Sequence, residues 1–205
     1  MSARPRTRLA PAARRDAILE VAGRLFSEHG YAAVSASEVA REAGVAPALV
    51  HHYFGGKRGL FIELVERLGP AVDEAVRVDT TRPLDARTRM FAERWLGWIS
   101  AHRQIWLATA GRDENITDRE LGAAVDRVRE RAIDSFIEDY PETLFDEPLI
   151  RLMLRSYLAF NRVVVRAWLN GSTSQADAQD LLADTLHVLI TAVAPALKNA
   201  PEKTS

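Results

Sequence analysis

Three consecutive side chains, His51, His52 and Tyr53, could each bind a polar ligand. An imidazole or a phenol can donate or accept a hydrogen bond at a base edge or at an oxyanion. Lys57 follows and suits a phosphate oxygen at the start of a helix, where backbone N–H groups point outward. Together these residue types favour recognition of a nucleic acid more than bond-breaking chemistry.

Motifs typical of catalysis or metal binding are absent from the sequence. We find no HExxH, no glycine loop for phosphate, no cysteine, and no two histidines at a metal-binding spacing on a helix. We therefore expect no catalytic residues, no metal and no cofactor. An all-helical enzyme that uses this region for other contacts is the weaker alternative.

The local signals around these residues predict two short helices joined by a tight turn. Ser35 is a favourable N-cap, and Glu38 three residues later completes a capping box. Gly44 allows a sharp turn, and Pro47 suits the first turn of the second helix. That helix spans about two turns and ends at Gly55-Gly56. This is the pattern of a helix-turn-helix, although a plain helical hairpin has similar geometry.

The residue identities favour the first of these interpretations, because residues 14–61 resemble the DNA-binding domain of the TetR family of regulators. The matching residues are Gly30-Tyr31, Ser35, Val39-Ala40, Ala43-Gly44-Val45, Tyr53-Phe54, Lys57 and Leu60-Phe61. The resemblance implies a reading surface made of Ser35, Ser37, Pro47, Ala48, Leu49, His51, His52, Tyr53 and Lys57. Ala46, Ala48 and His51 depart from the residues common in the family, so the resemblance does not fix the operator sequence.

Charge is distributed unevenly along the 205 residues, although the net charge is only −1. Residues 1–60 hold 9 basic and 5 acidic side chains, a net of +4, and the remainder holds 18 and 23, a net of −5. A basic head on an acidic body fits a phosphate-binding end. The absence of cysteine and of a secretory signal is compatible with a cytoplasmic protein, and no apolar run approaches the length of a membrane span.

Helical spacing of apolar residues continues through the rest of the chain, so we expect an all-α fold. An N-terminal domain over residues 1–60 contains a basic arm and the helix-turn-helix, and residues 61–205 form a helical body for effector binding and dimerisation. Besides the two short helices of the helix-turn-helix, we expect a short helix that includes residues 105–106. The longer helices are expected over about residues 12–29, 57–69, 84–101, 117–140, 148–169 and 175–194. Gly69-Pro70 should kink or end the helix that starts at residue 57.

The helix expected over residues 148–169 is apolar on most of its surface and must be buried on most sides. Its four arginines, Arg151, Arg155, Arg162 and Arg166, form one narrow stripe that indicates a solvated edge or a line of ion pairs. A body of this size has few elements to cover this helix and the last one. A second copy of the chain would cover both through a four-helix interface, as the TetR resemblance also implies.

All four tryptophans lie in the body, where an apolar ligand pocket is a hypothesis beside the simpler one of a packed core. The candidate lining residues are Phe91, Trp95, Trp98, His102, Tyr157 and Asn161. These features together predict a homodimeric regulator that binds a near-palindromic site on double-stranded DNA. We expect a repressor released by a small, mostly apolar effector; a DNA-binding dimer without an effector is the alternative.

Overall fold

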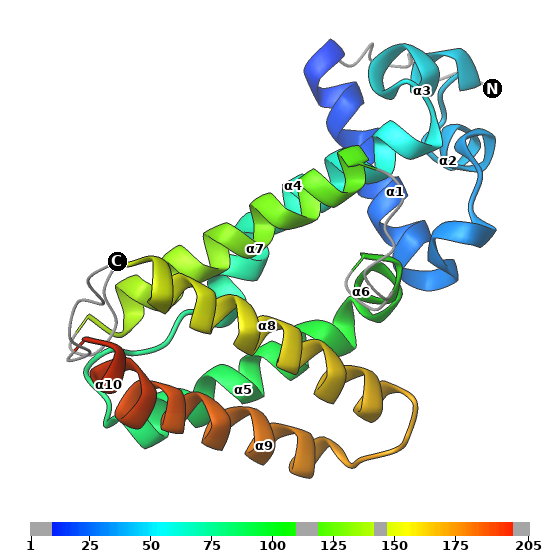
Figure 1. Cartoon of the computed structure of the whole chain (residues 1–205). Helices are drawn as coiled ribbons and strands as arrows, with labels where there is room; N and C mark the ends of the chain where they lie inside the picture. The colour runs from blue at the N-terminus through cyan, green and yellow to red at the C-terminus, as the bar shows by residue number, and fades with distance from the viewer. Residues whose placement is uncertain (1–9, 110–118, 142–146, 199–205) are drawn as a thin grey trace. The chain divides into compact units, whose positions relative to one another are not determined.

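The computed structural model describes residues 10–109, 119–141 and 147–198, and within these ranges the chain is helical without a strand (Figure 1). This confirms the predicted all-α class. The chain divides into two compact units, one ending at residue 65 and one starting at residue 66. The elements are α1 Pro11–Ala33, α2 Ala36–Glu42, α3 Pro47–Phe54, α4 Lys57–Val76, α5 Leu84–Ala101, α6 Arg103–Thr109, α7 Arg119–Asp139, α8 Pro148–Leu169, α9 Gln175–Val188, the π-helical turn η1 Leu189–Val193 and α10 Ala194–Lys198.

The first unit packs α1, α2, α3 and the first turns of α4 around one apolar core. The fully or nearly fully buried side chains include Ile18, Leu19, Ala22, Leu25, Phe26, Val34, Val39, Ala40, Val50, Leu60 and Phe61. Phe61 on α4 contacts two rings of α1, with ring centroids 5.2 Å from Phe26 and 4.5 Å from Tyr31. These aromatic contacts hold the start of α4 against α1.

Glycine is required where α3 passes into α4. Gly55 and Gly56 have φ of 71° and 116°, and Gly55 is the left-handed C-cap of α3, which confirms the predicted helix end. Gly59 lies in the first turn of α4, where a Cβ atom would overlap the carbonyl oxygen of Phe54. The close approach of these backbones fixes where α3 ends relative to α4.

The second unit is a bundle in which α9 packs against both α5 and α8 (Figure 1). Its core contains Phe91, Leu96, Ile133, Phe136, Tyr140, Ile150, Leu154, Tyr157, Leu182, Leu186 and Ile190. The Tyr157 hydroxyl donates to the Leu182 carbonyl oxygen at 2.9 Å, which joins α8 to α9 inside the core. Burial raises the pKa of this phenol well above its ordinary value, so it stays a neutral donor.

Helix α4 continues through Pro70 to Val76. Of the two effects predicted for Gly69-Pro70, a kink or a helix end, the helix end is therefore wrong. Val72 and Val76 are buried beyond the proline. Asp73 pairs with Arg131 of α7 at 2.6 Å. Burial and this ion pair compensate for the backbone hydrogen bond that a proline cannot donate.

Two other helix ends can be compared with those expected. Gly30 has a non-helical backbone (φ 81°, ψ 161°), so regular helix in α1 ends close to residue 29 as predicted, and a further short turn follows to Ala33. The last helix extends past residue 194 through η1 and α10 to Lys198. Residues 1–9 of the basic arm and the first two residues of the helix expected over residues 117–140 lie outside the described residues.

The close approach at Gly59 predicts the effect of a single methyl group. Gly59→Ala should lower the free energy of unfolding of the first unit by about 2 kcal/mol, because the added Cβ meets a backbone carbonyl that cannot move alone. Gly97→Ala is the matched control: it lies on an exposed part of α5 with nothing within 4 Å of the added Cβ. It should raise stability by up to about 1 kcal/mol through helix propensity. Thermal unfolding followed by circular dichroism measures both, and equal effects would contradict the argument.

Candidate functional site

The supporting helix α2 begins as the sequence predicts. The Ser35 hydroxyl accepts a hydrogen bond from the Glu38 backbone N–H at 3.1 Å, so Ser35 caps the helix. Ser37 is exposed in the first turn of α2. Gly44 turns the chain with a left-handed φ of 64°, and the Val45 N–H donates to the Ala40 carbonyl oxygen at 2.9 Å.

Helix α3 has one buried face and one exposed face. Val50 and Phe54 point into the core of the first unit. The exposed face carries two apolar and two imidazole side chains, Pro47, Ala48, His51 and His52, and half-buried Leu49 and Tyr53 flank it. Six of the nine predicted reading residues therefore come together on one short helix. We call Pro47, Ala48, His51 and His52 the reading ridge.

The two histidines of the reading ridge differ in freedom. The His51 ring packs against Gly56. A Cβ atom added to Gly56 would lie only 3.3 Å from the Cε1 atom of His51. The His52 ring lies beside Tyr53, with ring centroids 5.3 Å apart, and is otherwise exposed. His52 is therefore the ridge side chain best able to reorient toward a polar ligand.

Lys57 has a role that the sequence did not indicate. Its ammonium lies 4.4 Å from the centre of the Tyr31 ring and donates to the Ala32 carbonyl oxygen at 3.3 Å. These contacts tie the first residue of α4 to the end of α1. A lysine has three N–H donors, so two remain for a phosphate. The contact with Tyr31 joins residues 26 positions apart, which only the folded structure reveals.

The six residues predicted to line an effector pocket fall into two groups. Phe91 and Tyr157 fill the core, where both rings pack against Phe136 at centroid distances of 4.9 and 6.2 Å. Trp95, Trp98 and His102 stack in series along α5, with centroids 5.5 and 4.5 Å apart.

Asn161 contacts this stack and has the protein partner that the sequence could not identify. Trp95 Nε1 donates to Asn161 Oδ1 at 2.8 Å. Within the described part of the chain, the buried Nδ2 of Asn161 and Nε1 of Trp98 have no hydrogen-bond partner. The assignment of these residues to an effector remains a prediction.

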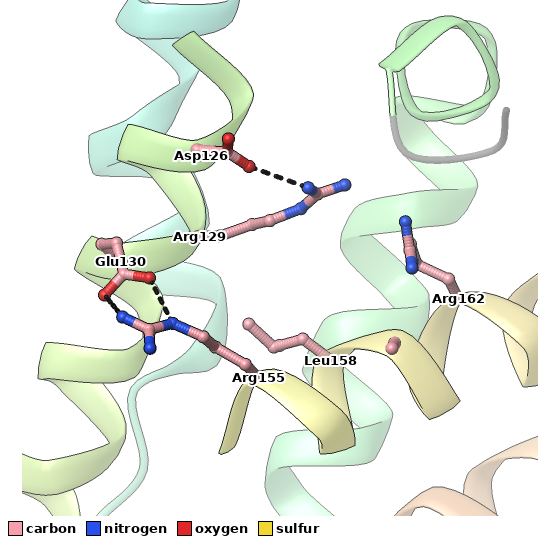
Figure 2. Close-up of a pocket in the computed structure, with 7 residues that line it drawn as sticks. Asp126, Arg129, Glu130, Arg155, Leu158 and Arg162 are labelled. Carbon is pink, nitrogen blue, oxygen red and sulfur yellow. Dashed lines mark hydrogen bonds and ion pairs between the residues drawn. The ribbon is translucent and has the colours of Figure 1, made fainter. Parts of the chain in front are cut away.

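A pocket of about 420 Å³ lies between α7 and α8, and none of those six residues lines it. Figure 2 shows its charged lining, which comprises Asp126, Arg129, Glu130, Arg155 and Arg162, together with the side chain of Leu158. The sequence predicted that Arg151, Arg155, Arg162 and Arg166 form either a solvated edge or a line of ion pairs. Two of the four, Arg151 and Arg155, form ion pairs with Glu130 and Asp134. The sequence did not reveal a pocket, because the acidic partners lie on another helix. No group of three potential metal ligands occurs among the described residues.

Comparison with known proteins agrees with this geometry. Residues 18–64 match the family described as bacterial regulatory proteins, tetR family. The HTH-type transcriptional regulator BetI of Rhizobium meliloti (strain 1021) is 48% identical over 64 residues, which are 31% of this chain and 32% of that protein. BetI of Brucella anthropi is 37% identical over 83 residues. The chain thus spans about a third of the length of the curated relatives it matches.

Solved structures resemble the chain over nearly its whole length. A tetR-family transcriptional regulator from Streptomyces coelicolor superposes with a TM-score of 0.77 at 23% identity, covering 95% of this chain and 93% of that one. The regulator FadR from Bacillus subtilis, solved in complex with stearoyl-CoA, gives a TM-score of 0.61 at 17% identity, with coverage of 86% and 97%.

A capped supporting helix, a glycine turn and a short helix with an exposed polar ridge define a helix-turn-helix protein of the DNA-binding class. Residues 18–64 match the tetR family of bacterial regulatory proteins, and the all-helical fold resembles that of solved tetR-family regulators over nearly the whole chain. The relatives named above are transcriptional regulators and not enzymes.

Proposed function

We propose that this protein is a homodimeric, ligand-responsive transcriptional repressor that acts in the cytoplasm. In this proposal α3 enters the major groove of an operator, α8 and α9 form the dimer interface, and a small molecule bound in the body lowers operator affinity. The reading ridge is the observation that carries the proposal. Residues 1–60 and 61–205 would act as the DNA-binding and the effector-binding and dimerisation domains.

The reading ridge suits sequence recognition because it combines two kinds of contact. Pro47 and Ala48 present apolar atoms for thymine methyl groups, and His52 presents ring nitrogens for base edges. Ser37 and Lys57 flank the ridge and would contact phosphates, which position the helix without reading sequence. Ser35 would contribute chiefly by capping α2.

The dimer interface is inferred from apolar side chains that one protomer leaves uncovered. Leu149, Leu152 and Val163 of α8 are exposed by 52%, 56% and 68%, and at about 100° per residue they share one side of the helix. Leu181 and Val188 of α9 are exposed by 49% and 54% and also share one side. Two neighbouring helices with uncovered apolar stripes fit a twofold four-helix interface.

The last helical segment supports the same conclusion. The expectation that no apolar run approaches the length of a membrane span is wrong for Gln175–Lys198, which could cross a membrane by length and composition alone. An 18-residue stretch of this segment has a mean hydropathy of 1.4, yet only 28% of that stretch is buried. In a transcriptional regulator, a second protomer is the simplest cover for such a surface. Leu186 of this helix is also apolar, but its side chain is fully buried within one protomer and packs in the core.

An effector response is proposed from the connection between the pocket and α4. Helix α7 lines the pocket and pairs with α4 through Arg127–Glu66 and Arg131–Asp73. Helix α4 continues without interruption to Lys57 in the first unit. A ligand that shifts α7 would therefore displace α4 and change the separation of the two reading helices, which must fit successive major grooves about 34 Å apart. A dimer that binds DNA without an effector is the alternative, favoured if no small molecule changes operator affinity.

DNA recognition predicts a contrast between two exposed histidines. A duplex selected by the wild-type protein from a random-sequence pool should bind with an affinity that falls steeply with salt concentration. His52→Ala should change the base preference, with a loss of about 1–3 kcal/mol on the preferred duplex. His29→Ala, an exposed histidine at the end of α1, is the matched control and should leave the preference unchanged. Lys57→Ala should weaken binding to all duplexes about equally.

Fluorescence anisotropy across a set of single-base operator variants measures these effects. A salt-independent affinity, or the same base preference in His52→Ala as in the wild type, would contradict the proposed reading surface.

Dimerisation predicts that a charge on the uncovered stripe separates the protomers. Val163→Glu should convert the dimer to a monomer, because an unpaired carboxylate would be buried at the interface. Ser100→Glu on the exposed side of α5 is the control and should remain dimeric. Sedimentation velocity distinguishes the two states, with circular dichroism to show that both variants fold. A Val163→Glu dimer as stable as the wild type would place the interface elsewhere.

A further inference from the structure

We propose that the pocket between α7 and α8 binds the anionic oxygen group of a small organic acid or phosphate ester through Arg129 and Arg162. The identification of this molecule as the effector rests on the proposed function. The binding of the anion does not, because it depends only on residues of the second unit.

The charges lining the pocket are not balanced. Three arginines and two carboxylates line it. Glu130 accepts two hydrogen bonds from Arg155, at 2.8 and 3.0 Å. Asp126 pairs with Arg129 at 3.0 Å. Arg162 has no acidic partner in the part of the chain that the structure describes.

Arg129 and Arg162 extend toward the same space from opposite helices, as Figure 2 shows. Burial lowers the pKa of the Arg129 guanidinium, and the positive charge of Arg162 lowers it further. Two like charges that converge in a partly buried site repel each other. An oxyanion between them would accept charge-assisted hydrogen bonds from both and remove the repulsion.

The rest of the pocket suits an apolar body attached to that anion. Leu158 and Ala159 of α8 line it between the arginines. A volume of about 420 Å³ falls in the range of small-molecule sites and exceeds what a lone inorganic ion needs. The expected ligand is therefore an amphiphilic anion, in contrast to the mostly apolar effector that the tryptophans indicated.

Isothermal titration calorimetry of the full chain tests this with three probes of equal chain length: sodium octanoate, octyl phosphate and neutral 1-octanol. At least one anion should bind the wild type at least about tenfold more tightly than 1-octanol, the effect of one charge-assisted hydrogen bond. The anion that binds more tightly shows whether the expected ligand is a carboxylate or a phosphate ester.

Arg162→Gln and Arg129→Gln should each weaken that anion at least about tenfold, and Arg162→Lys should weaken it less. Arg89→Gln is the matched control, since Arg89 is 60% exposed and pairs with Asp180 at 3.5 Å on another face. Binding of neither anion, equal binding of 1-octanol, or an equal loss in Arg89→Gln would overturn the proposal.

DNA binding separates this proposal from the proposed function. Without added anion, Arg162→Gln should bind the selected duplex as the wild type does. If the anion binds through the arginines and leaves duplex affinity unchanged, the anion site stands and the effector role fails. If neither the wild type nor Arg162→Gln binds DNA, the proposed function fails. The calorimetry still shows whether the anion binds through the arginines.

Discussion

Helix α8 is constrained on three sides at once, and the organisation of the second unit depends on this. One side, with Leu154, Tyr157 and Val165, is buried in the core. A second carries the arginines that face α7, and a third leaves Leu152 and Val163 exposed. At about 100° per residue these three stripes do not overlap. The core, the pocket and the proposed dimer interface therefore share one rigid element.

In the proposed mechanism, ion pairs of the second unit would connect the pocket to α4. Arg155 of α8 binds Glu130 of α7, and α7 in turn pairs with α4. Exposed ion pairs are individually weak, typically below about 1 kcal/mol, so such links can rearrange when an anion competes for an arginine. The link from α4 to α1 is different in kind, because Phe61 and Lys57 pack against the rings of the first unit. We expect α4 to move as one body with its reading helix.

Local signals explain why the helix-turn-helix could be predicted from sequence. The Ser35 cap, the Gly44 turn and the Gly55 helix end each depend on residues within four positions, and the structure has all three. Tertiary contacts explain what was missed. Asn161 bonds to Trp95, 66 residues away, and Pro70 is tolerated because α7 supports the turn beyond it. The pocket was also missed, since it requires Arg129 and Arg162 to meet from different helices.

The central claim is that the exposed side of α3 lies against DNA, and the absence of cysteine allows a direct test. A single cysteine introduced by Ala48→Cys can carry a photoactivatable cross-linker, with Ser100→Cys on α5 as the matched control. Irradiation with the selected duplex should cross-link Ala48→Cys to bases in the major groove of each half-site and leave Ser100→Cys uncross-linked. Equal cross-linking from the two positions, or none from position 48 in a complex that forms, would contradict the account.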